Sequence, residues 1–305
     1  MIPAPRLPHP IPYQGSKRNL APLIAPYIPN DVRTWYEPFA GSAAMTIWAA
    51  HHGLAERFVI SDALRPMCEL WTAIIAEPEA TAARYSEVWQ GQVAAGDGYF
   101  NDVRARYNEA HDPVDLLYLI CRCVKNAVRF NRHGRFTQSH DKRRLGMKPE
   151  KMASAIGGAA RLLAGKTSVR CGDWLKTTID ASPSDFIYMD PPYFGTTVGR
   201  DKRYAEQLEP DRLVAGLEDM RGRGLRFALS YDGMTGEKTY CEPLPETLGL
   251  TRLLLHAGKS SQATLAGRSE DTIESLYITP CLGSPVEGII RRSSPQPSFN
   301  FAAAS

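Results

Sequence analysis

The chain has 305 residues, of which 43% are hydrophobic, and its formal net charge is +3. This composition excludes an intrinsically disordered chain and fits one or two folded domains. No apolar run is long enough to span a bilayer, and the proline-rich residues 1–12 lack the basic and apolar parts of a secretory signal. We therefore expect a cytoplasmic protein that does not bind membranes. Its cysteines and histidines do not cluster, so no metal site is expected.

Short β-prone runs alternate with helical patterns along most of the chain. Helical spacing is expected at 42–51 and 211–223. The expected strands are 34–37, 57–61, 168–171, 186–189, 226–230, 251–255 and 274–278. Strands that alternate with helices predict an α/β fold with a largely parallel sheet.

The pattern changes between the second and third expected strands. Residues 63–165 are mostly helical, which predicts a helical insertion into a domain formed by 1–62 and 166–282. The remaining residues, 283–305, are rich in Ser, Pro and Ala, and we expect them to form a disordered tail.

Asp190-Pro191-Pro192-Tyr193 directly follows the apolar strand 186–189. It is therefore expected at the carboxyl end of the sheet, where open α/β folds bind ligands. There the Asp190 carboxylate and the Pro191 carbonyl can accept both hydrogens of an amino group, which localises the nitrogen lone pair for attack on an activated methyl group. Pro192 stiffens the turn, and the Tyr193 ring can stack on an extruded base. Taken alone, the tetrapeptide is equally typical of an ordinary turn.

Small residues follow the first expected strand, in the run from Glu37 to Ala43. They allow a ligand to approach the backbone closely, although the run lacks the second glycine of the dinucleotide-binding pattern. A cofactor without a pyrophosphate, such as S-adenosylmethionine, is compatible with this, and Glu37, Phe39 and Gly41 are the candidate contacts. The alternative is a tight turn between a strand and a helix.

Four further polar or aromatic residues are candidates for the same cofactor. Asp62 ends the second expected strand and can accept hydrogen bonds from ribose hydroxyls, while Asp173 ends the third and can contact the adenine. Either could instead be a helix N-cap. Tyr13 and Lys17 lie in a loop before a helix. There they could contact the methionine portion of S-adenosylmethionine, or they could simply form a turn.

The order of these motifs resembles the D12 class of DNA adenine methylases, the Dam-like enzymes, from about Tyr13 to Pro280. The resemblance implies a Rossmann-like S-adenosylmethionine-dependent methyltransferase fold with a mostly parallel, seven-stranded sheet. It also implies that the helical insertion recognises the DNA target, that Tyr13, Lys17, Asp62 and Asp190 contact the cofactor, and that a flipped adenine in duplex DNA is methylated at N6.

A basic segment spans residues 125–144, with seven basic residues and one acidic residue. Its net charge is +6, whereas the rest of the chain has a net charge of −3. Phosphates are held by positive side chains, and base edges are read by Asn, Gln and Arg, so DNA contact is favoured over a solvated helix face. The candidate DNA contacts are Lys125, Asn126, Arg129, Asn131, Arg132, Arg135, Phe136, Gln138, Arg143 and Arg144.

Two other functions remain open on the sequence. Methylation of cytosine N4 needs the same geometry around an exocyclic amine, although Asp190 favours adenine. A DNA-binding protein that has lost catalysis is the second alternative, against which the intact Asp190–Tyr193 motif argues. We expect a monomer, and a cognate restriction endonuclease is a possible functional partner that forms no stable complex with it.

Overall fold

The computed structural model describes residues 7–192, 208–236, 238–239, 241–259 and 270–291. Tyr193 therefore lies outside the described residues. Within the described segments, no helix is both long enough and apolar enough to cross a membrane.

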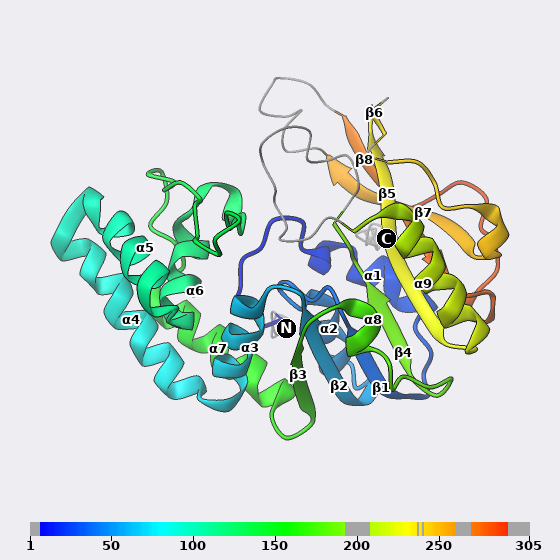
Figure 1. Ribbon diagram of the computed structural model, residues 1–305, viewed down its shortest axis with the longest axis horizontal. Helices are drawn as coiled ribbons and strands as arrows, with labels where there is room; N and C mark the ends of the chain where they lie inside the picture. Colours follow the sequence, from blue (N-terminus) through cyan, green and yellow to red (C-terminus); the bar gives the residue numbers. More distant parts are fainter. Residues whose placement is uncertain (1–6, 193–207, 237, 240, 260–269, 292–305) are drawn as a thin grey trace, which may run out of the picture.

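A single twisted sheet runs through the centre of the molecule (Figure 1). Its strands are β1 (Val32–Glu37), β2 (Ala55–Asp62), β3 (Thr167–Cys171), β4 (Phe186–Met189), β5 (Arg226–Thr235), β6 (Lys238–Thr239), β7 (Thr251–Lys259), β8 (Asp271–Ile278) and β9 (Ile289–Ile290). They lie in the order β3-β2-β1-β4-β5-β8-β7-β9, with β6 paired to β5.

Most neighbouring strands are parallel, as the sequence predicted. β1 to β5 form one parallel block, while β8 is antiparallel to both β5 and β7. This arrangement confirms the Rossmann-like methyltransferase fold. The seven expected strands are all present, and two strands of two residues each, β6 and β9, bring the number within the described segments to nine. Because Ile289–Ile290 pairs with β7, the expectation of a disordered tail is wrong for these residues.

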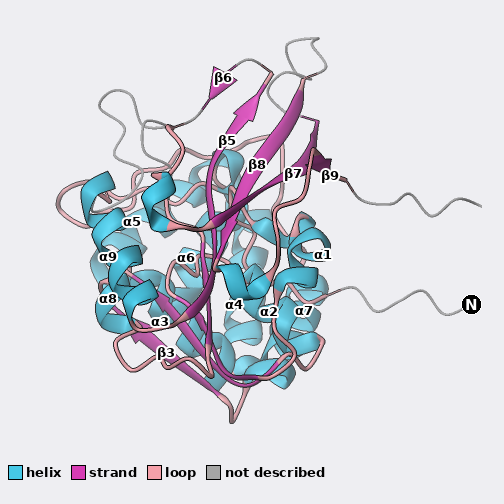
Figure 2. Cartoon of the chain, turned by 90° about the vertical axis from the view of Figure 1, so that its right-hand side faces the viewer, coloured by secondary structure: helices cyan, strands magenta, loops and turns pink. Residues whose placement is uncertain are grey.

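Helices cover both faces of the sheet (Figure 2). They are α1 (Ala21–Ile24), α2 (Ala44–His51), α3 (Arg65–Ala76), α4 (Pro78–Ala95), α5 (Tyr99–Ala110), α6 (Pro113–Arg122), α7 (Pro149–Leu163), α8 (Trp174–Thr177) and α9 (Pro210–Gly222). One face carries α8 and α9, and the other carries α1, α2 and α7.

Alternation along the buried strands supplies both cores. In β4, Phe186 and Tyr188 join the hydrophobic cluster on one face, while Ile187 and Met189 join the cluster on the other. Parallel strands covered on both faces need apolar residues at every position, and all four residues of β4 are buried. The rigid strand fixes the position of Asp190, which follows it.

The chain between β2 and β3 forms α3 to α7, and α4 to α6 lie away from the sheet (Figure 1). Helix α3 contacts both β2 and β3, and α7 contacts α2. The hydrophobic cluster that contains Phe186 and Tyr188, called the first hydrophobic cluster below, therefore continues from the sheet into these helices. Whether residues 63–165 act as a separate target-recognition domain stays a prediction.

Candidate active site

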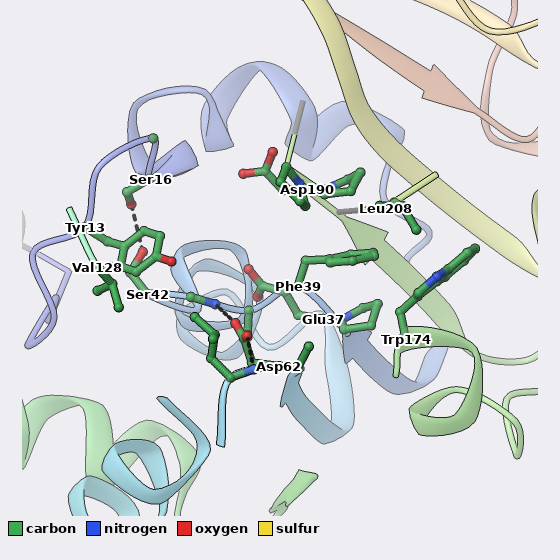
Figure 3. A pocket seen from close by; sticks show the side chains of 18 of the residues that line it. Tyr13, Ser16, Glu37, Phe39, Ser42, Asp62, Val128, Trp174, Asp190 and Leu208 are labelled. Atoms are coloured by element: carbon green, nitrogen blue, oxygen red, sulfur yellow. Dashed lines mark hydrogen bonds between the residues drawn. The ribbon is translucent and has the colours of Figure 1, made fainter. Parts of the chain in front are cut away.

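A pocket of about 280 Å³ lies where the carboxyl ends of β1, β2, β3 and β4 meet (Figure 3). Pro191 and Pro192 line it, whereas Tyr193 lies outside the described residues. All eight residues predicted to bind a cofactor also line it: Tyr13, Lys17, Glu37, Phe39, Gly41, Asp62, Asp173 and Asp190. Parallel strands end at a common edge, so residues that are far apart in the sequence meet here.

The turn after β1 forms the floor of the pocket. Gly41 and Ala43 both have left-handed backbones, with φ of 47° and 46°. The Gly41 N–H donates to Asp62 Oδ2 at 3.0 Å, and Trp71 Nε1 donates to the Gly41 carbonyl at 2.9 Å. Ala43, which stands where the dinucleotide-binding pattern would have a second glycine, thus has the backbone conformation that glycine favours, and it is the N-cap of α2.

Gly41 also leaves room for an aromatic ring. A Cβ added at Gly41 would lie 3.1 Å from Cε1 of Tyr13. We predict that Gly41→Ala lowers the free energy of unfolding by about 2 kcal/mol, from backbone strain plus displacement of the ring. Gly53→Ala is the matched control, since Gly53 has φ of 64° and open space around it. Urea unfolding should show a loss of only about 1 kcal/mol for the control, and equal losses would contradict the contact with Tyr13.

The two aspartates at the ends of β2 and β3 are held by backbone donors. Asp62 Oδ1 accepts from Leu64 N at 2.9 Å, in addition to the bond from Gly41. Burial raises the pKa of Asp62, and these N–H groups lower it. Asp173 is the N-cap of α8, because it accepts from Leu175 N at 3.2 Å, and it also pairs with Arg212 at 2.5 Å. Its capping role does not remove it from the pocket.

Two aromatic side chains face the same end of the pocket. The rings of Phe39 and Trp174 lie 5.8 Å apart with a tilt of 35° (Figure 3). Trp174 follows Asp173 directly, and Phe39 lies two residues beyond β1. An apolar wall beside a carboxylate suits a heteroaromatic ring that also carries an amino group.

Asp190 lies in a cluster of three charged side chains, of which one is buried and two are partly exposed. Lys17 Nζ is 3.0 Å from Asp190 Oδ1 and 3.1 Å from Glu274 Oε2, and the lysine side chain is only 7% exposed. Burial raises the pKa of Asp190 to about 6, with Lys17 lowering it and Glu274 raising it. Sequence reasoning missed Glu274, although an acid directly before the mostly apolar end of β8 was a signal.

Glu37 is a second acid whose pKa is raised above its ordinary value. Oε2 accepts from Thr46 N at 2.6 Å and from Thr46 Oγ1 at 2.5 Å, and the side chain is buried. Burial raises the pKa of Glu37 to about 8, against the effect of these bonds, and the negative charge of Asp190 adds to the increase. At neutral pH Glu37 is therefore mostly uncharged, and Asp190 carries the negative charge of the pair.

The basic segment is a loop with an interior of its own. Phe136 is 1% exposed and packs against Tyr107 and Phe130, and Gln138 is 7% exposed and donates to the Val124 carbonyl at 3.1 Å. Both were expected to contact DNA. The structure corrects this expectation, because these side chains hold the loop together from inside.

Other expected DNA contacts have mixed roles. Asn126 donates to the Ile120 carbonyl, and Asn131 accepts from two backbone N–H groups of its own turn. Arg143 and Arg144 both pair with Asp141. Lys125, Arg132 and Arg135 are exposed, as the segment's predicted function requires.

The loop also reaches the pocket. Ala127, Val128 and Arg129 are part of its lining, and the Gln14 N–H donates to the Asn126 carbonyl at 3.2 Å. The basic loop and the N-terminal loop with Tyr13 therefore form adjacent parts of one rim. A polyanion held on the exposed arginines would lie next to the pocket.

Three known proteins that resemble this chain are all named as methyltransferases or modification methylases. Type II methyltransferase M.FokI of Planomicrobium okeanokoites is 22% identical over 227 residues, modification methylase StsI of Streptococcus sanguinis 23% over 233, and modification methylase LlaI of Lactococcus lactis 25% over 239. Each match covers 72% of this chain but only 35% or 36% of the relative, so the chain matches about a third of these proteins' length.

A family model gives the wider match. The model of the D12 class N6 adenine-specific DNA methyltransferases matches residues 13–248, from the loop with Tyr13 past helix α9. The match includes β1 to β6 and every residue predicted to bind the cofactor or to carry catalysis. The chain belongs to the D12 class N6 adenine-specific DNA methyltransferase family.

Proposed function

We propose that this protein transfers a methyl group from S-adenosylmethionine to N6 of an adenine flipped out of duplex DNA. The observation that carries the proposal is the position of Asp190, which follows a buried strand and faces a pocket lined by all eight predicted cofactor residues. The names of the relatives, which are modification methylases, support a role in modifying DNA.

The pocket suits S-adenosylmethionine by shape and by charge. Phe39 and Trp174 offer apolar surface for an adenine, with Asp173 beside them, and Asp62 retains lone pairs for ribose hydroxyls. Lys17 can reach a carboxylate, and the negative charge of Asp190 suits a sulfonium. When bound, the cofactor supplies a methyl group whose carbon–sulfur bond breaks, with the electron pair staying on sulfur, as the nitrogen–carbon bond forms.

The chain's own groups would prepare the nucleophile. The lone pair of an adenine amino group is delocalised into the ring, which makes the nitrogen a poor nucleophile. The Asp190 carboxylate and the Pro191 carbonyl would each accept one amino hydrogen and favour tetrahedral nitrogen. The methylated nitrogen is strongly acidic, so its extra proton would pass to water.

The exposed part of the basic loop would hold the DNA backbone. We predict that the double substitution Arg132→Ala/Arg135→Ala weakens binding of duplex DNA about tenfold. The slope of the logarithm of the binding constant against the logarithm of the salt concentration should become shallower by about two. Arg33→Ala/Arg57→Ala is the matched control, because these exposed arginines lie near the amino ends of β1 and β2, at the opposite edge of the sheet. Fluorescence anisotropy at several salt concentrations measures both effects, and equal losses in both variants would argue against this loop.

The proposal is tested by product analysis. The purified protein is incubated with labelled S-adenosylmethionine and duplex DNA, and the DNA is then digested to nucleosides. The expected product is N6-methyladenine. Labelled N4-methylcytosine would establish the cytosine alternative, and the absence of label in DNA would indicate a binding protein without catalysis. Modification-sensitive sequencing of DNA from expressing cells gives the recognition site.

A further inference from the structure

We infer that Glu274 is a positioning residue for Asp190 and acts on it through Lys17. The inference rests on the proposed function and extends it, because it assigns a role in the reaction to a residue of β8, beyond the motifs that identify the family. Its starting point is the pair of contacts at Lys17, which bridges Asp190 Oδ1 and Glu274 Oε2 at almost equal distances.

The backbone fixes all three partners. Lys17 begins a short 3-10 helix, Asp190 follows β4, and Glu274 lies inside β8, between its pairings with β5 and β7. Alternation along β8 places Glu274 on the same face of the sheet as Leu276 and Ile278, which belong to the first hydrophobic cluster. A side chain in the middle of a paired strand has little freedom to move, so Glu274 holds the ammonium group in place.

The position of Lys17 determines which oxygen of Asp190 is available. The ion pair involves Oδ1, which leaves Oδ2 to accept an amino hydrogen from the substrate. Without Glu274, the ammonium group would lose the attraction that draws it away from Oδ2, which favours a more symmetric pairing with both oxygens of Asp190. Such a pairing would compete directly with the substrate amine.

Glu274 also changes the charge that Asp190 presents. Because both oxygens lie within 3.1 Å of one nitrogen, they are no more than about 6 Å apart, a distance at which like charges interact strongly. Two carboxylates share one ammonium, so the cluster retains a net negative charge when both are ionised. Asp190 is then a stronger acceptor than a carboxylate paired with its own lysine.

Titration of Asp190 tests this role without requiring DNA. The carboxyl carbon is followed by NMR in the ligand-free full chain, and the spectrum of Asp190→Asn assigns its resonance. In Glu274→Gln the midpoint of Asp190 should fall by about one pH unit, because the negative charge that raises its pKa is lost and the Lys17 ammonium group is no longer shared with Glu274. Glu274→Asp keeps the negative charge, so its midpoint should stay close to that of wild type. Glu218→Gln, at an exposed position on α9, is the matched control and should leave the midpoint unchanged.

Methylation kinetics supply the second measurement. In Glu274→Gln the acid limb of the kcat profile should move to lower pH by the same amount, and the plateau should fall about tenfold with KM for DNA unchanged. An unchanged NMR midpoint overturns the inference, and so does a shifted midpoint with an unshifted acid limb. A purely structural role would lower the melting temperature and leave the midpoint in place. If the midpoint of Glu274→Gln shifts as expected but the wild-type protein methylates no DNA, the proposed function fails while the coupling between Glu274 and Asp190 stands.

Discussion

Replacing Asp190 with alanine should lower the rate of DNA methylation by roughly a thousandfold, while S-adenosylmethionine binds no more than about tenfold more weakly. The carboxylate contributes most where charge develops on the amino nitrogen, and Lys17, Phe39 and Asp62 still line the cofactor pocket. Single-turnover transfer of labelled methyl groups gives the rate, and calorimetry gives the affinity. The two numbers separate loss of catalysis from loss of the cofactor.

Two further variants show whether the effect belongs to this carboxylate. Asp190→Asn keeps the shape of the side chain but introduces donors, so it should be nearly as inactive as the alanine variant. Asp173→Asn lies in the same pocket and should raise the Kd of the cofactor with a much smaller effect on the rate of transfer. Both Asp190 variants leave Lys17 paired with Glu274, so they should fold. Full activity in Asp190→Ala would refute the catalytic assignment.

The position of the candidate site could be predicted from the sequence because parallel strands end together. Each acidic residue at or just beyond the end of an expected strand, such as Asp62, Asp173 and Asp190, must lie at one edge of the sheet once the strands are parallel. The helical residues between β2 and β3 were likewise visible by their spacing. These inferences need only local patterns and the rule that strands alternate with helices.

Glu274 could not be placed in the same way. It reaches the site from an antiparallel strand that lies two positions from β4, and the order of strands in a sheet is set by packing between distant segments. Phe136 and Gln138 show a different limit. A loop has no repeating pattern of hydrophobic residues, so the sequence does not indicate which of its side chains face inward. The short pairing of Ile289–Ile290 with β7 also depends on a neighbour that is about 35 residues away.

The two acids beside Lys17 differ from Glu37 in one respect that matters for the reaction. Asp190 and Glu274 share a positive partner, whereas the described donors to Glu37 are the Thr46 hydroxyl and backbone N–H groups, all of them neutral. Burial without a countercharge favours the protonated form. Glu37 can therefore bind neutral donors of a ligand without adding a second charge next to Asp190.

Glu37 should for this reason make the stability of the protein depend on pH. Its pKa is about 8 in the folded chain, against an ordinary value of 4.5. Between these two pH values, Glu37 therefore takes up a proton when the chain folds. The stabilising effect of the protonated form is complete below about pH 4.5 and is lost as pH rises through about 8. Glu37→Gln is neutral at every pH. From pH 5.5 to 8.5 the variant should therefore gain on the order of 3 kcal/mol of unfolding free energy relative to wild type.

Urea unfolding at a series of pH values measures this difference, because it compares two chains that share every other titrating group. Asp190 contributes a shift of the same sign, with a pKa of about 6, but it does so in both chains and cancels. Glu56→Gln, an exposed position on the neighbouring strand β2, is the matched control and should follow wild type at all pH values. Parallel curves for Glu37→Gln and wild type would mean that Glu37 is ionised when folded, and the pocket would then hold one more negative charge for a bound sulfonium.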